Sequence, residues 1–213
     1  EIDVYAMQYV NLPYVYTVDR VGENCGIISR GAVAAVDSRA WWMGRAGFFM
    51  WDGASVQPLG CDVYDAVFGD LNITQRSKVV CGLIPDKSEI WWAFPSSSST
   101  ENDTVVVYNY LEGHWALHDV ERTCLTHRNV FNNPIFGKSD SLLYDAETGT
   151  NYDDATPYAE SGPVELGNGD RIARVRRLIF DEGTEGDVQV SVKTKNWNND
   201  ADVTYGPYSA PNP

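Results

Sequence analysis

The sequence predicts an all-β fold made of β-propeller-like four-stranded blades, with one short helix and a C-terminal β-sandwich-like segment. Short strand signals separated by turn residues recur along the chain, which is typical of sandwiches and propellers. Aromatic doublets stand at Trp41-Trp42 and Trp91-Trp92, and one strand-turn-strand pattern occurs more than once. We expect blades over residues 1–157 and a β-rich segment, incomplete at its C-terminal end, over residues 158–213.

The first strands are expected within residues 1–20, where "VYAMQYVNLPYVYTV" is rich in Val and Tyr and is interrupted by Pro13. A strand of small residues follows from Ile27 to Val36. A hairpin comes next, with strands at 40–43 and 48–51 and an Asp52-Gly53 exit, which is a strong turn signal.

Residues 62–79 break the β pattern. Val63, Val67, Phe68 and Leu71 are spaced as on one face of a helix, and Asp62 is a plausible N-cap. We predict one helix of two to four turns here. Gly69 weakens its middle because glycine loses the most backbone freedom in a helix.

Strand signals resume after this helix. A polar loop, "PSSSSTEND", separates two of the strands, and "YLEGHW" predicts a hairpin turn with Gly113 in the left-handed conformation. The expected strands are Val79–Leu83, Glu89–Phe94, Thr104–Tyr110 and His114–His118.

An internal repeat connects distant parts of the chain. Trp42-Met43-Gly44 aligns with Ile135-Phe136-Gly137, 93 positions later, and Phe49-Met50-Trp51-Asp52 aligns with Leu142-Leu143-Tyr144-Asp145. A third unit lies between them, around residues 90–94 and 105–115. Four-stranded units of this period are typical of propeller blades, which bury large flat side chains against each other. We therefore interpret the tryptophans as blade packing, with one member of each doublet on either face of its strand: Trp41, Trp42, Trp51, Trp91, Trp92 and Trp115.

The composition limits the function. Sixteen basic and 30 acidic residues give a formal net charge of −14, which argues against a protein that grips nucleic acid. The same charge is compatible with a wall past which duplex DNA slides. The four cysteines show no CxxC spacing, so we expect free, mostly buried thiols.

No pattern indicates an enzyme, a cofactor or a metal. His114 and His118 would share a metal only on a helix, and the strand signals around them argue against one. "DAETGTNYDD" at 145–154 resembles a calcium loop only weakly. No nucleophile or phosphate-binding motif is present, so we expect no catalytic, cofactor-binding or metal-binding residues.

A basic cluster lies in the C-terminal part. Its members are Arg171, Arg174, Arg176 and Arg177. In a strand, Arg174 and Arg176 would share one face, and Arg177 would lie on the other. Pairing with nearby carboxylates, contact with a neighbouring subunit and contact with DNA phosphate all remain open, and the cluster is a possible subunit interface. Val188, Val190 and Val192 alternate with polar residues, which predicts a half-solvated strand.

Three stretches, "WWMGRAGFFMWDG", "VVVYNYLEGHW" and "ESGPVELGNGD", resemble the tail nozzle proteins of short-tailed bacteriophages, also called tail tubular protein B or packaged-DNA stabilisation proteins. The resemblance implies a structural virion protein of the phage tail, assembled in the host cytoplasm, which retains packaged DNA and conducts it during ejection. It implies a sixfold ring of copies, an adaptor protein and tail fibres or spikes as partners, and duplex DNA passing without specific binding. Family members are several hundred residues long, so we expect this chain to be part of a larger one, without a membrane span.

The alternative is a carbohydrate-binding or host-receptor-recognition β-propeller module, in which exposed Trp and Tyr stack on sugars. A glycan-cleaving enzyme on a propeller scaffold is a third hypothesis. Thirty carboxylates make some close pair inevitable, so the sequence does not single out a catalytic dyad.

Overall fold

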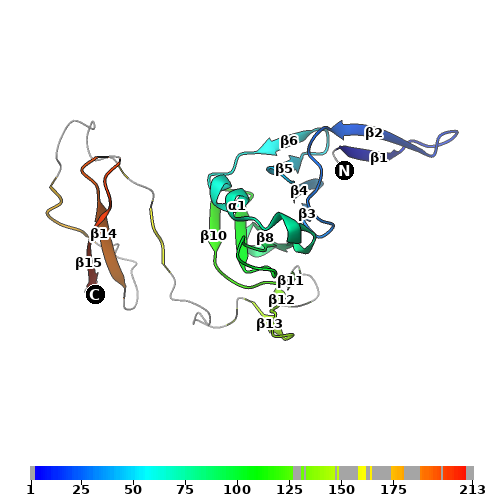
Figure 1. The fold of residues 1–213 in the computed structure, drawn as a ribbon. Helices are drawn as coiled ribbons and strands as arrows, with labels where there is room; N and C mark the ends of the chain where they lie inside the picture. The colour runs from blue at the N-terminus through cyan, green and yellow to red at the C-terminus, as the bar shows by residue number, and fades with distance from the viewer. Residues whose placement is uncertain are drawn as a thin grey trace. The chain divides into compact units, whose positions relative to one another are not determined.

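The described part of the chain is all-β with one short α-helix, as the sequence predicts. The computed structural model (Figure 1) describes residues 3–126, 131, 133–146, 148, 158–161, 164, 174–179, 188–197 and 199–209. The chain divides into two compact units, Glu1–Ala155 and Thr156–Pro213, and each is described here by itself.

The chain begins with an antiparallel hairpin of β1 (Val4–Tyr9) and β2 (Tyr16–Gly22), so the expected pair of strands interrupted at Pro13 is confirmed. We call residues 4–22 the arm. Its two strands run together away from the other strands of the first unit (Figure 1). Its base is anchored at Gly22, where an added Cβ would lie 2.6 Å from the Cys25 sulfur and 2.8 Å from a methyl carbon of Val56.

The first four-stranded sheet is an antiparallel meander in chain order. Its predicted hairpin is confirmed, and the Asp52-Gly53 exit is stabilised by the Asp52 carboxylate, which accepts hydrogen bonds from the backbone N–H groups of Ala54 and Ser55 at 2.9 and 2.8 Å. The strand expected from Ile27 is shorter than predicted and begins at Val33, although Ile27 forms an isolated bridge to Gly44. The strands are β3 (Val33–Val36), β4 (Arg39–Met43), β5 (Phe48–Trp51) and β6 (Val56–Leu59).

The predicted helix is present at the short end of the expected two to four turns, and Asp62 is not its N-cap. The helix α1 covers Tyr64–Asp70, with Val63 at the N-cap position and no side-chain cap. Leu71 is extended because it pairs with Ser96, and the backbone N–H of Asn72 donates to the Pro95 carbonyl at 2.9 Å. The chain then turns into a 3₁₀ helix, η1 (Ile73–Lys78), whose first turn is capped by the Asn72 side chain.

The second four-stranded sheet is also an antiparallel meander, and all four of its strands occur where the sequence predicts them, within one residue at either end. Gly113 lies in its last turn with φ of 77°, so the expected left-handed conformation is confirmed. A short 3₁₀ helix, η2 (Pro85–Lys87), leads from the first strand to the second. The strands are β7 (Val80–Ile84), β8 (Glu89–Phe94), β9 (Thr104–Asn109) and β10 (Trp115–His118).

A third antiparallel sheet follows with three strands, β11 (Cys124–Leu125), β12 (Ile135–Gly137) and β13 (Leu143–Asp145). The repeat seen in the sequence now has a structural meaning. Trp42 and Ile135 stand in the second strands of their sheets, and Phe49 and Leu143 stand in the third strands.

The three sheets share one arrangement, in which their first strands are neighbours. The strand β7 lies beside both β3 and β11. Gly31, just before β3, forms a parallel bridge with Val80, and its carbonyl accepts from the Cys81 N–H at 2.7 Å. Consecutive meanders with adjacent first strands are the arrangement expected for propeller blades.

In the second unit, the described residues hold one antiparallel pair, β14 (Gln189–Thr194) and β15 (Val203–Ser209). The predicted alternation is confirmed, because Val190 and Val192 are half-buried while Gln189 and Ser191 are exposed. The Lys193 ammonium lies 2.6 Å from the Glu160 carboxylate, and this contact raises the pKa of Lys193. The remainder of the expected sandwich-like segment stays a prediction.

Candidate assembly surfaces

Large aromatic side chains fill the space between the first two sheets. Trp41 and Trp92 are both buried in one hydrophobic core, together with Phe48, whose ring lies 5.0 Å from that of Trp92. Trp92 is fully buried and its Nε1 donates to the carbonyl of Ala32, just before β3, at 3.0 Å. This contact joins the two sheets through a hydrogen bond as well as through apolar area.

In the second sheet, the strands β7, β8 and β9 are buried on both faces. In β8, Ile90 and Trp92 face the core shared with the first sheet, whereas Trp91 and Ala93 belong to a second core, on which Leu125 of β11 packs. This alternation is what a strand gives when successive side chains point to opposite faces. The polar edge of Trp91 is satisfied by Glu89, which accepts from its Nε1 at 2.8 Å.

Trp115, in β10, packs against the core that the first and second sheets share. Its ring lies 4.7 Å from that of Phe48 and 4.6 Å from that of Tyr108. Its Nε1 donates to the Gly60 carbonyl at 2.8 Å, just after β6. The last strand of the second sheet is therefore tied to the end of the first.

The outer face of the first sheet, opposite the second sheet, is less well covered. Trp42 lies there and is buried, with its Nε1 donating to the Cys25 carbonyl at 2.6 Å. Beside it is a pocket of about 300 Å³, lined by Trp42, Trp51, Val33 and residues at the base of the arm. The indole Nε1 of Trp51 is buried and has no hydrogen-bond partner among the residues that the structure describes. Val33, also in the lining, is 42% exposed.

The polar loop between β8 and β9 is ordered rather than simply solvated. The Asp103 carboxylate accepts from both the backbone N–H and the hydroxyl of Ser96, each at 2.7 Å. Asn102 is buried and donates to the Lys78 carbonyl at 2.8 Å, and Lys78 also pairs with Glu101. The sequence indicated a loop here but not this network, which attaches the loop to η1.

The described members of the basic cluster do not lie in a strand. Arg171 lies outside the described residues. Arg174, Arg176 and Arg177 are exposed, in a stretch from 174 to 179 without regular secondary structure. The division of these side chains between two faces, which holds only in a strand, therefore does not apply to them, and an interface role for the exposed arginines stays a proposal.

The possible metal ligands do not assemble within the described part of the chain. No group of three or more His, Cys, Asp or Glu side chains there could hold a metal ion. His118 stacks on Trp91 with ring centroids 5.8 Å apart. Most of the weak calcium-loop match, residues 147 and 149–154, lies outside the described residues.

All four cysteines are free thiols, and two of them, Cys25 and Cys81, are buried. Burial raises the pKa of both and of the half-buried Cys61. Cys124 is exposed.

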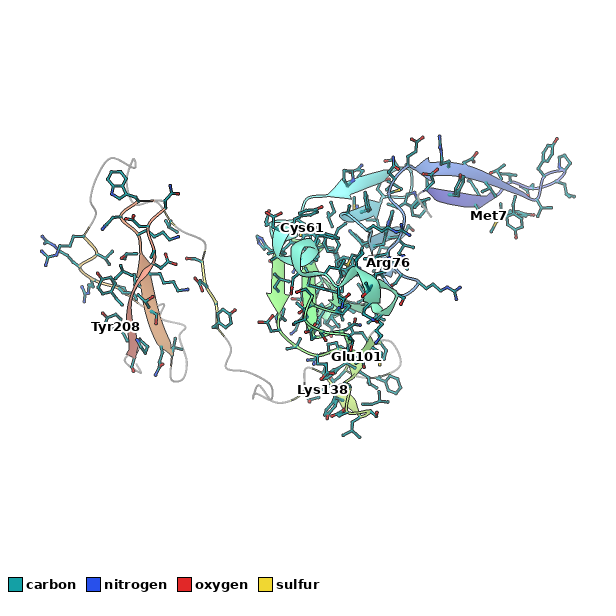
Figure 2. The ribbon with its side chains drawn as sticks, in the orientation of Figure 1. Met7, Cys61, Arg76, Glu101, Lys138 and Tyr208 are labelled. Carbon is teal, nitrogen blue, oxygen red and sulfur yellow. The ribbon has the colours of Figure 1, made fainter. Side chains whose placement is uncertain are left out.

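Sequence reasoning predicted the strands of the arm but missed its exposure. Met7 points away from the arm into solvent (Figure 2) and is 69% exposed. Leu12 and Tyr14 at the tip are 85% and 75% exposed. The sequence carried no signal for this exposure, since no charged residue occurs from Val4 to Val18 and such a stretch is ordinarily buried.

The chain matches no protein-family model, and no curated protein matches it significantly. Among the helices that the structure describes, none is long and apolar enough to cross a membrane.

Proposed function

We propose that this chain is a structural component of a phage tail nozzle, which retains packaged DNA and conducts it during ejection. The observation that carries the proposal is the stacking of three consecutive small sheets through their adjacent first strands, with aromatic cores between them. This architecture is extended by adding sheets rather than by elaborating a single pocket. It agrees with the resemblance of the sequence to tail nozzle proteins.

The charge balance supports the same proposal. A net charge of −14 repels duplex DNA, so the wall of a conduit with this composition would not retain the duplex at each phosphate. In this function the copies associate with one another, with an adaptor ring and with tail fibres or spikes, and no residue performs chemistry.

The test is the state of association of the purified chain. Negative-stain electron microscopy and mass photometry should reveal closed rings, with or without an adaptor-type ring, and an electrophoretic assay should detect no retention of duplex DNA. A chain that stays monomeric at all accessible concentrations and does not join an adaptor ring would refute the proposal.

The second candidate, a carbohydrate-binding or receptor-recognition module, is favoured by a different observation. The tryptophans of both doublets are buried, but Tyr5, Tyr9 and Tyr14 of the arm are exposed and could stack on sugar rings. Binding to a glycan array that is lost in Tyr14→Ala, in a chain that forms no rings, would favour this candidate.

A further inference from the structure

The arm is an apolar surface that the described residues of this chain leave uncovered. At its tip Val10, Leu12, Tyr14 and Val15 are 40%, 85%, 75% and 45% exposed. The uncharged stretch from Val4 to Val18 stands out in a chain with 30 acidic residues. Contiguous exposed apolar residues of this kind mark an interaction site.

The tip is held in one shape before any partner binds. Tyr9 and Tyr16 are paired across the two strands, with ring centroids 5.7 Å apart in an edge-to-face contact. The Val10 N–H donates to the Val15 carbonyl at 3.1 Å. A surface ordered in advance loses little conformational entropy on binding.

The pocket on the outer face of the first sheet has the complementary character. Its lining is mostly apolar and includes Ile27, Val33, Trp42 and Trp51. Its one acidic lining residue, Asp3, already interacts with the Arg20 guanidinium at 3.4 Å and the Asn24 N–H at 3.3 Å. The pocket therefore suits an apolar side chain.

The arm cannot fill the pocket of its own chain. Val4, Tyr5, Ala6 and Val21 at the base of the arm line that pocket. The tip lies at the other end of β1, which has six residues and so spans about 20 Å. Any contact between tip and pocket must therefore join two molecules.

The two surfaces are matched in chemical character. Two copies of a chain with net charge −14 repel each other over most of their surfaces, so a contact between copies has to be made through regions that carry little charge. The tip has no charged residue, the one acidic residue of the pocket is paired with Arg20, and the two regions differ from each other. Different surfaces that fit each other make a head-to-tail contact, which closes into a ring when the rotation between copies allows it.

We propose that the tip of the arm docks in the pocket of a second copy of this chain, with Leu12 or Tyr14 entering the pocket. This inference rests on the proposed function, because it names the contact through which the copies of a nozzle ring would associate. Each copy gives one arm and receives one.

A complementation experiment tests the docking. Leu12→Asp places a charge on the tip, Val33→Asp places one in the pocket, and Leu111→Asp is the matched control at a residue 75% exposed in the turn between β9 and β10. In mass photometry, Leu12→Asp and Val33→Asp should each need at least about tenfold more protein than the unaltered chain to assemble, because each variant weakens the contact between copies. Leu111→Asp should assemble as the unaltered chain does. A mixture of the two defective variants should form dimers, because one intact tip and one intact pocket remain.

Photo-crosslinking gives a readout that does not depend on a pocket variant folding. A photoreactive amino acid at position 12 should join that position to peptides containing Trp42 or Trp51 of a second copy. Rings that form equally well in Leu12→Asp would overturn the docking and leave the nozzle proposal standing. Crosslinks between two arms would also overturn the docking. It would be overturned as well if the unaltered chain floats with vesicles of phosphatidylcholine and phosphatidylglycerol while Leu12→Asp does not. A chain that never associates would refute both proposals.

Discussion

Trp92 and Ala32 are 60 positions apart in the chain, yet the indole Nε1 of Trp92 donates a 3.0 Å hydrogen bond to the Ala32 carbonyl. The same carbonyl accepts from the Met43 N–H at 3.1 Å, within the first sheet. A single oxygen thus receives one bond from its own sheet and one from the next. Position 92 therefore controls how firmly the two sheets are joined.

Two substitutions of Trp92 should destabilise the first unit by different amounts. Trp92→Phe keeps most of the apolar volume but loses the hydrogen bond, and should lower the free energy of unfolding by about 1–2 kcal/mol. Trp92→Ala also leaves a cavity and should lower it by about 3–5 kcal/mol. Urea denaturation followed by circular dichroism measures both changes. Trp197→Ala, at a residue 74% exposed, is the control and should change the value by less than about 0.5 kcal/mol.

A second prediction concerns the close approach of β7 to β11. A Cβ added at Gly82 would lie 3.1 Å from the Leu125 Cβ, so a valine there would push the two strands apart. We expect Gly82→Val to lower the free energy of unfolding by about 1–3 kcal/mol, the usual cost of overpacking. At Gly60 an added Cβ meets nothing within 4 Å, so Gly60→Val is the matched control. Equal stability of the two variants in urea denaturation would contradict the close approach.

The sequence predicted those parts of the fold that local pattern determines. The strand Glu89–Phe94 lies as predicted, because its apolar residues are bounded by turns and both of its faces are buried. The helix after Asp62 ends before Leu71, which the helical spacing had included, because Leu71 pairs with Ser96 across the fold. Such tertiary contacts override local preference and leave no mark in the local pattern.

The candidate surfaces were less predictable, for a related reason. The tryptophans indicated packing, but a strand pattern does not tell which face will find a neighbour, so the open pocket beside Trp42 and Trp51 emerged only from the structure. The exposure of Leu12 is likewise a property of the whole fold. The conformation around Arg174 and Arg176 was not predicted either, and the described residues 174–179 form no regular secondary structure.

A third prediction concerns pH and the turn after β5. Hydrogen bonds from the backbone N–H groups of Ser55 and Ala54 hold the pKa of Asp52 below its ordinary value of 3.8. The carboxylate thus contributes stability at pH values above 3.8. As the pH falls through the lower pKa of the folded state, this contribution is lost. Asp52→Asn should remove it at neutral pH and leave the two proteins alike in strong acid. Urea denaturation across the acid range compares them, and NMR titration of the carboxyl carbon gives the pKa directly. A gap in stability that persists unchanged in strong acid would show that the charge is not the cause.

The thiols give a fourth prediction, which tests the core without altering a residue. The thiolate is the nucleophile in alkylation, and burial raises the pKa of Cys81, which lies in the core between the first two sheets. Cys124 is exposed at the start of β11. Iodoacetamide at mildly alkaline pH should therefore modify Cys124 first and leave Cys81 unmodified while the protein is folded. Peptide mass spectrometry measures the extent at each position, and the same reaction in strong denaturant, where all four cysteines should react, is the control. Alkylation of Cys81 as fast as Cys124 in the folded protein would mean that the core opens readily, and the close packing of the first two sheets around Trp92 would then be wrong.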